Sequence, residues 1–223
     1  MKKDFELKIL PLGGCYEVGM NMMVFETPRD IIVIDCGMGF SDHNYFGVDI
    51  LVPDFSYAVE RKDKIRGIFI THGHEDHIGS IPFLLRQINV PIYCTKFPAE
   101  LIKRKLQEEG LKGDINVIEK LQEHRAGEFA VTLFPVPHSI PQTSGIKVKI
   151  HDSTLVYISD FKIGESKKTF NSHFSDLHLS NPDVLFLDST NVENEGSTGE
   201  EETVVPALKK IMTEATHKII FTT

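Results

Sequence analysis

The chain has 223 residues, 41% of them hydrophobic, and a formal net charge of −8 at pH 7 with histidine counted as neutral. This length can bury one substantial core, so we expect one large domain, or one domain with part of a second. The negative charge argues against non-specific adhesion to nucleic acid, although carboxylates that bind a metal also count toward it.

Asp4 and Glu6 interrupt the first apolar residues of the sequence, so we do not expect these residues to form a membrane anchor. No later apolar run approaches the ~20 residues that a membrane span requires. The sequence therefore predicts a cytoplasmic protein with no membrane attachment. The three cysteines are widely spaced and form no CxxC pattern, which argues against a disulfide framework and predicts free core thiols.

Short β-rich runs bounded by Gly, Pro, Asn or Asp recur along the chain and predict strands. They cover residues 5–10, 22–26, 30–37, 65–72, 91–94, 115–119, 129–136, 145–150, 153–160 and 183–190. Helix-like segments lie between some of them, at 54–63, 78–87 and 97–110. Strands in hairpin-like succession that alternate with helices favour an α/β sandwich with mixed sheets.

The composition changes at the polar segment 191–201, after which residues 201–216 read as a helix with Thr198 and Glu201 in capping-box register. Residues 217–223 then resemble the start of a strand. We therefore predict that residues 1–195 form the first domain, in incomplete form, and that residues 196–223 are a linker and the beginning of a second. A chain that ends as it enters a strand is expected to be truncated.

The segment THGHEDH, residues 71–77, concentrates potential metal ligands where a buried strand runs into a loop. His72 and His74 alternate along the backbone and can converge on one metal, while Asp76 and His77 can turn toward a second. Zn²⁺ accepts this mixture of nitrogen and carboxylate ligands. A polar loop with Asp76 as a helix cap is the alternative, but it leaves three histidines unexplained.

Two metals need further ligands, and two strand ends offer them. His138 follows the predicted strand at 129–136, and Asp160 ends the one at 153–160. Each residue also has an ordinary interpretation, as a surface histidine and as a turn cap. Their position at strand ends makes both of them candidates.

Seven segments in this order resemble the metallo-β-lactamase superfamily, and specifically its β-CASP nucleases of ribonuclease J type. The segments are GGCYEVGMNM, IDCGMGF, GVDILVPDFSYA, THGHEDHIGSIPFLL, VPHSIPQTSG, YISDFKIG and FLDSTNVENEGSTGEE. The resemblance implies an αββα sandwich with mixed sheets, followed by the start of a β-CASP domain. Other members of the superfamily would share the histidine motif without VPHSIPQTSG or LDSTN.

The resemblance also implies a dinuclear zinc site, with Mn²⁺ as an alternative metal. His72, His74 and His138 would hold one ion, Asp76 and His77 the other, and Asp160 would bridge them. Asp35 would be the supporting acid behind the ligands, and Asp188 the acidic residue that opens the β-CASP portion. Either could instead be a turn residue, as could Glu17 and Asn21, which match the family pattern near the site.

The implied activity is hydrolysis of single-stranded RNA by a zinc-activated hydroxide, as a 5′-to-3′ exonuclease, an endonuclease or both. Nothing here matches the family's further ligand histidine, so we expect this chain to be impaired. His173, His178 and His217 lack its surroundings. A hydrolase of small esters or thioesters and a non-catalytic metal-binding subunit remain alternatives. Homo-oligomerisation and pairing with a related nuclease subunit also stay open.

Overall fold

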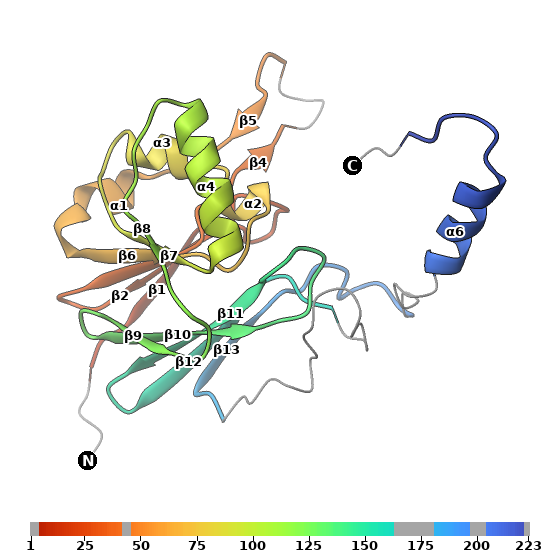
Figure 1. The fold of residues 1–223 in the computed structure, drawn as a ribbon. Coiled ribbons are helices and arrows are strands. Elements are labelled where there is room, and N and C mark those ends of the chain that lie inside the picture. The colour runs from red at the N-terminus through yellow and green to blue at the C-terminus, as the bar shows by residue number, and fades with distance from the viewer. Residues whose placement is uncertain (1–4, 42–45, 163–180, 197–203, 221–223) are drawn as a thin grey trace.

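The computed structural model of the protein describes residues 5–41, 46–162, 181–196 and 204–220 (Figure 1). Within these residues the larger sheet has six strands in the order β1-β2-β3-β6-β7-β8. Their bounds are β1 (Lys8–Gly13), β2 (Met22–Glu26), β3 (Ile31–Ile34), β6 (Ile65–Phe69), β7 (Ile92–Cys94) and β8 (Ile115–Val117).

The second sheet has five described strands in the order β13-β12-β11-β10-β9. Their bounds are β9 (Glu123–Ala126), β10 (Phe129–Pro135), β11 (Ser144–Ile150), β12 (Ser153–Ile158) and β13 (Val184–Leu187). Strands β4 (Gly39–Phe40) and β5 (Ile50–Leu51) form a small antiparallel pair of their own. The helices are α1 (Ser56–Glu60), the 3₁₀ helix η1 (Lys62–Lys64), α2 (Glu75–Ile78), α3 (Ile81–Leu85), α4 (Lys96–Glu108) and α6 (Val204–Glu214).

Both large sheets are mixed, as predicted. In the first, β1, β2 and β3 pair antiparallel, whereas β3, β6, β7 and β8 pair parallel. In the second, β9 to β12 pair antiparallel and β13 adds a parallel edge strand. Parallel neighbours require crossover connections, and the helices α3 and α4 occupy such connections.

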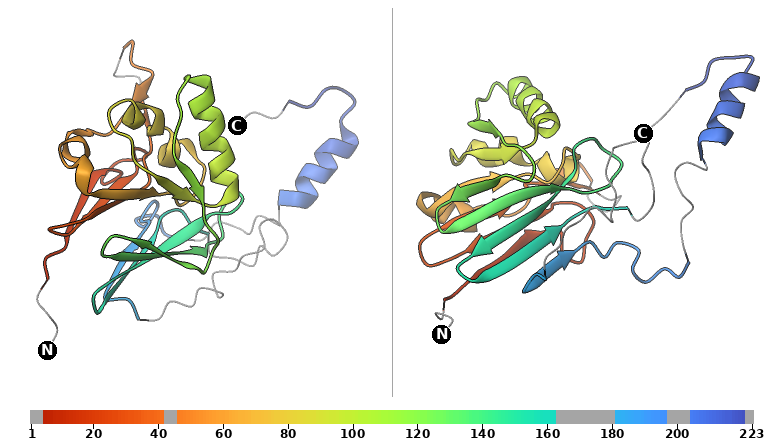
Figure 2. Two further views of the ribbon diagram at one scale, coloured as in Figure 1. Left: turned by 60° about the vertical axis from the view of Figure 1, so that its left-hand side comes forward. Right: turned by 60° about the horizontal axis from the view of Figure 1, so that its bottom comes forward.

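Two apolar cores lie on opposite faces of the six-stranded sheet. Along β2, Met22 and Val24 pack into the core beneath helices α1 to α4, while Met23 and Phe25 pack against the second sheet. This alternation follows from the two-residue period of a strand. Figures 1 and 2 show the resulting layers, with helices on one face of the first sheet and the second sheet on the other. The helix layer expected over the outer face of the second sheet is not formed by any described residue.

The predicted helix over 78–87 is divided into two short helices. α2 begins earlier, at Glu75 inside the histidine motif, and α3 begins after Ser80 with Pro82 in its first turn. Proline lacks a backbone N–H and is therefore favoured where a helix starts. Strands β4, β5 and β9 were not predicted, because the first two are very short and β9 is the polar stretch Glu123–Ala126.

Helix α6 lies within the predicted helix 201–216, and its described side chains are exposed. It stands apart from the sandwich in both views of Figure 2. Residues 217–220 do not form the predicted strand, so that prediction is wrong for them, and residues 221–223 and the capping pair at 198 and 201 lie outside the described residues. The domain boundary between residues 195 and 196 stays a prediction.

None of the described helices is long and apolar enough to cross a membrane. The three cysteines are free, as predicted, but only two of them are core residues. Cys36 and Cys94 are buried, whereas Cys15 is exposed on the loop between β1 and β2.

Candidate metal centre

The candidate ligands gather where strands of both sheets end. Asp35 directly follows β3, and the motif at 71–77 follows the parallel neighbour β6. His138 follows β10 and Asp160 follows β12, which run in the same direction in the second sheet. The ends of strands that run in one direction meet at one edge, so the fold brings these segments together.

The histidine motif is fixed by backbone hydrogen bonds. Three consecutive carbonyls of the motif accept hydrogen bonds from backbone N–H groups of two neighbouring segments. The Glu75 carbonyl accepts from Met38 (3.1 Å), the Asp76 carbonyl from Asn21 (3.1 Å) and the His77 carbonyl from Cys36 (2.8 Å). The approach is so close that a Cβ atom on Gly37 would lie 1.6 Å from the Asp76 carbonyl oxygen. Only glycine fits at position 37.

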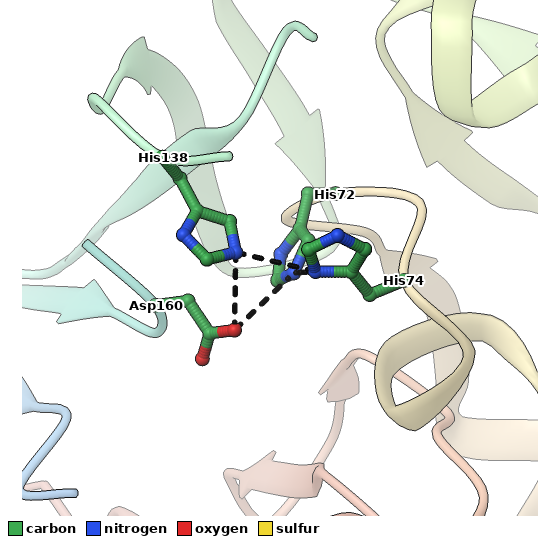
Figure 3. A group of neighbouring side chains, drawn as sticks. All are labelled: His72, His74, His138 and Asp160. Atoms are coloured by element: carbon green, nitrogen blue, oxygen red, sulfur yellow. Dashed lines mark hydrogen bonds and ion pairs between the residues drawn. The ribbon is translucent and has the colours of Figure 1, made fainter. Parts of the chain in front are cut away.

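The first donor set consists of His72, His74, His138 and Asp160, drawn in Figure 3. Nδ1 of His74 lies 3.0 Å from Nε2 of His72 and 3.2 Å from Nε2 of His138. Oδ2 of Asp160 lies 3.2 Å from Nε2 of His138 and 3.6 Å from Nε2 of His72. Three imidazole nitrogens and one carboxylate oxygen thus converge on a common point.

This spacing fits a tetrahedral metal ion. Four ligands at ~2.0–2.1 Å from a tetrahedral Zn²⁺ are about 3.3 Å apart, which is close to the distances in the first donor set. A neutral imidazole has a lone pair on its unprotonated nitrogen, and these three nitrogens can direct their lone pairs to the same point when the protons lie on the opposite nitrogens. A cation between them would accept all three lone pairs.

The second donor set consists of Asp76, His77 and Asp160. Nε2 of His77 lies 3.4 Å from Oδ2 of Asp76 and 3.6 Å from Oδ1 of Asp160. The two oxygens of Asp160 therefore face different sets, Oδ2 toward the first and Oδ1 toward the second. This is the arrangement of a carboxylate that can bridge two cations.

Two of the candidate ligand imidazoles are held from behind by buried polar groups. Nδ1 of His77 lies 2.8 Å from Oδ2 of Asp35, and both side chains are completely buried. Nδ1 of His72 lies 3.0 Å from the hydroxyl of Thr71, which itself donates to Asp35 at 2.8 Å. Such outer contacts fix the tautomer and the ring orientation of a ligand histidine. Asp35 also accepts from the backbone N–H of Thr71 at 2.8 Å.

Asn21 supports the second donor set from the loop between β1 and β2. Its amide Nδ2 lies 3.3 Å from Oδ2 of Asp76 and 3.1 Å from the Asp76 backbone oxygen. The side chain therefore orients Asp76 as well as tying two strand connections together. Sequence reasoning left Asn21 undecided between a site residue and a turn residue, and the structure places it against the donor set.

Three of the candidate ligands, His72, His74 and Asp160, have pKa values that favour their metal-binding protonation states. Burial lowers the pKa of His72 to about 4 and also lowers that of His74, so both rings are neutral at pH 7. Burial acts to raise the pKa of Asp160, but hydrogen bonds to His138, His72 and His77 outweigh it and leave that pKa lowered. Neutral imidazoles and an ionised carboxylate are the forms that bind metal.

His77 differs from these rings. Burial acts to lower the pKa of His77, but hydrogen bonds to Asp160 and Asp76, together with the charge and hydrogen bond of the adjacent Asp35 carboxylate, outweigh burial and raise that pKa well above its ordinary value. The same carboxylate would stabilise a cation held at the other ring nitrogen, which would compete with the proton.

Asp188 lies outside both donor sets. It follows β13, its backbone N–H donates to the Ile158 carbonyl at 3.1 Å, and its carboxylate accepts from the backbone N–H of Thr190 at 2.8 Å. It does line the same cavity of about 1300 Å³ as Asp76, His138 and Asp160. The predicted role of Asp188 therefore remains a prediction, with its turn contact observed.

The other described histidines lie elsewhere. His124 packs against the ring of Tyr93, His151 packs against that of Phe5, and His217 is exposed. The histidines at 43, 173 and 178 lie outside the described residues. Sequence reasoning missed Thr71, whose hydroxyl contacts both Asp35 and His72; its place directly before the first motif histidine was the available signal.

Comparison with known proteins places the chain in a family. A family model described as a β-lactamase superfamily domain matches residues 31–217. Ribonuclease J of Helicobacter pylori is 41% identical over 226 residues, which cover 97% of this chain and 32% of that protein. Ribonuclease J of Thermus thermophilus is 35% identical over 230 residues, covering 97% and 40%. The chain thus spans less than half the length of these relatives.

Solved structures share the fold at low sequence identity. A protein of unknown function from Enterococcus faecalis aligns with a TM-score of 0.72 and 16% identity, covering 93% of this chain and 57% of that one. A metallo-β-lactamase variant from Cronobacter sakazakii gives 0.55 and 16%, covering 89% and 81%. The predicted α/β metallo-β-lactamase fold with mixed sheets is therefore confirmed, while the start of a β-CASP domain stays a prediction. The chain belongs to the metallo-β-lactamase superfamily and is related in sequence to the ribonuclease J proteins.

Proposed function

We propose that this chain carries the metal centre of a ribonuclease of ribonuclease J type, which hydrolyses phosphodiester bonds of single-stranded RNA. The observation that carries the proposal is the pair of donor sets that share Asp160. Identity of 41% to a ribonuclease J over 97% of the chain supports RNA as the substrate. We further propose a cytoplasmic enzyme that acts as a 5′-to-3′ exonuclease, an endonuclease or both.

The donor chemistry fits two cations. His72, His74, His138 and Asp160 would hold one, and Asp76, His77 and Asp160 the other. Zn²⁺ suits this mixture of imidazole and carboxylate, and Mn²⁺ is the second candidate. When bound, the cations would supply Lewis-acid activation of water and would neutralise charge on the phosphate oxygens.

The protein's own groups prepare the site for that chemistry. Asp35 accepts a hydrogen bond from Nδ1–H of His77, so the lone pair of Nε2 faces the second donor set. Thr71 performs the equivalent task for His72. A cavity of about 1300 Å³ lies beside the donor sets and is lined by Asp76, His138 and Asp160. We expect substrate to approach the donor sets through this cavity, while Asp35 and Thr71 keep the two rings oriented.

A chimera provides the test. This chain would replace the aligned segment of Helicobacter pylori ribonuclease J, and the product would be assayed with and without Asp76→Asn at fixed salt. Substrates are a 5′-monophosphorylated single-stranded RNA, a circular RNA of the same sequence and a small ester. We expect metal-dependent RNA cleavage that Asp76→Asn reduces by orders of magnitude, with the circular RNA reporting endonuclease action.

The remaining outcomes contradict the proposal in different ways. Turnover of the ester without RNA cleavage would indicate a small-molecule hydrolase of the same superfamily. Metal binding without turnover of either substrate would indicate a non-catalytic metal-binding subunit. Size measurement of the chain alone, and mixed with an intact ribonuclease J, tests self-association and pairing.

A further inference from the structure

The connection between β10 and β11, residues 136–143, carries His138 into the first donor set. We call it the His138 loop. Its two ends meet where the backbone N–H of Val136 donates to the Thr143 carbonyl at 3.2 Å. The position of His138 therefore depends on how the closed loop is attached to the rest of the protein.

His138 has less support of its own than two of the other ligand histidines. Nδ1 of His72 contacts Thr71, and Nδ1 of His77 contacts Asp35. Nδ1 of His138 is buried and has no hydrogen-bond partner among the described residues. The ring is thus not fixed from behind, and its orientation must come from the backbone of the His138 loop.

Gln142 ties this loop to the start of α4. Its side-chain Oε1 accepts from the backbone N–H of Phe97 at 2.8 Å, and its backbone carbonyl accepts from the hydroxyl of Thr95 at 3.3 Å. The first N–H groups of a helix have no partner within the helix. Thr95 is the N-cap residue of α4 but makes no side-chain capping bond. Gln142 therefore supplies the missing cap from another segment.

Lys120 anchors the other side of the loop. Its Nζ donates to the Thr143 carbonyl at 2.7 Å from the connection that precedes β9. Thr143 is buried, and the next residue, Ser144, donates its backbone N–H to the Thr71 carbonyl at 2.9 Å. The loop end is thus joined both to Lys120 and to the segment that leads into the histidine motif.

We infer that Gln142 and Lys120 are positioning residues for the first donor set: they hold the His138 loop so that His138 completes the set. The inference rests on the proposed metal centre. It assigns to two residues outside the donor sets a measurable effect on metal affinity. Residues that support ligands from outside the coordination sphere typically contribute 10- to 100-fold in affinity.

The test compares Gln142→Ala with Gln142→Glu in the full 223-residue chain. Gln142 has a φ of 62°, and Ala and Glu both keep a Cβ atom at this left-handed position. The two variants therefore have the same backbone strain at position 142, and they differ in whether the side chain can accept the hydrogen bond from Phe97. A glutamate carboxylate can accept from Phe97 and is favoured at a helix N-terminus. Lys120→Met removes the second anchor but keeps the apolar stem of the side chain.

Zn²⁺ affinity is measured by competition with a chelating indicator, and folding by circular dichroism and thermal unfolding. We expect about 10- to 100-fold weaker binding at the tighter site in Gln142→Ala and in Lys120→Met, with restored binding in Gln142→Glu. The matched controls are Gln107→Ala and Lys103→Met, exposed residues of α4. Both should bind Zn²⁺ like the wild type.

Unchanged affinity in folded Gln142→Ala and Lys120→Met would overturn the inference while leaving the proposed metal centre intact. Equal loss in Gln142→Glu and Gln142→Ala would overturn the capping role of Gln142. Absence of Zn²⁺ and Mn²⁺ binding by the wild type would overturn both the proposed centre and this inference.

Discussion

Oδ2 of Asp35 lies 2.8 Å from Nδ1 of His77, and neither side chain is accessible to solvent. Such a pair is costly to bury unless further hydrogen bonds satisfy the carboxylate. Asp35 meets this requirement with two bonds from Thr71. The backbone of Asp35 is also left-handed, with a φ of 60°, which short polar residues tolerate better than others. The backbone and the hydrogen bonds at the end of β3 therefore both support the contact between Asp35 and His77.

Replacing Asp35 by Asn should weaken metal binding at the second donor set by about 10- to 100-fold, since the amide no longer holds the imidazole as a charged acceptor. Isothermal titration with Zn²⁺ measures the effect, and thermal unfolding checks that the variant is folded. Asp152→Asn, at an exposed hairpin position, is the matched control. A folded Asp35→Asn variant with wild-type affinity would contradict the supporting role.

Replacing His72 and His74 together by Ala should abolish binding at the first donor set, because two of its four donors are lost. Metal content after dialysis against Zn²⁺, measured by atomic emission, reports the result. The control is His151→Ala with His217→Ala, two exposed histidines that belong to neither donor set. Retention of a tight site in the double motif variant would place the metal elsewhere.

The two donor sets should fill with unequal affinity. The first offers three imidazoles and a carboxylate, whereas the second offers one imidazole, Asp76 and a share of Asp160. Stepwise titration should resolve a tighter and a weaker site, and Asp76→Asn should remove only the weaker one. Two equally tight sites would show that a further residue completes the second set.

Gly37→Ala should destabilise the fold by about 3 kcal/mol, the upper range for overpacking, because the new methyl group meets the Asp76 carbonyl. Urea unfolding measures the free energy. Gly110→Ala is the control: its φ is +66°, but nothing lies within 4 Å of the added carbon. It should cost about 1 kcal/mol through backbone conformation alone. Equal losses of unfolding free energy in the two variants would mean that the segments around Gly37 and Asp76 can move apart to accommodate the methyl group.

Lys120 should make stability depend on pH in the alkaline range. Burial lowers its pKa to about 8, while the unfolded chain keeps the usual value near ~10.4. Between these values the unfolded state binds more protons, so the free energy of unfolding rises with pH. The wild type should therefore gain stability relative to Lys120→Met from pH 8 to about 10.5. Parallel pH profiles of the two proteins would contradict the lowered pKa.

Much of this site was predictable from local patterns. The motif histidines are adjacent in sequence, and His138 and Asp160 stand where β-rich runs end, a position that recurs in functional sites. The supporting contacts were less accessible to sequence reasoning. Gln142 meets Phe97 across 45 residues, and Asn21 meets Asp76 across 55. Neither pairing has a periodic signature, because both depend on how two separate strand connections approach each other.

The strands also differ in how closely they could be predicted from the sequence. β2 and β3 are continuous apolar runs and were located closely, since burial on both faces leaves a clear signal. β9 was missed because its residues Glu123–Ala126 are mostly polar, and it is a strand only through pairing with β10. Asp188 shows the opposite case, in which a recognisable sequence position lies beside the cavity without joining a donor set.

The first donor set draws on both sheets: His72 and His74 follow β6, whereas His138 and Asp160 follow β10 and β12. A cation held by these residues would act as a noncovalent cross-link between two layers, in addition to the apolar side chains and the hydrogen bonds that already join them. Its binding would add to the free energy of unfolding, by about 2.7 kcal/mol at a free concentration 100 times the Kd. Chelation would then lower the melting temperature and weaken the contact between the two sheets at the edge that carries the donor sets.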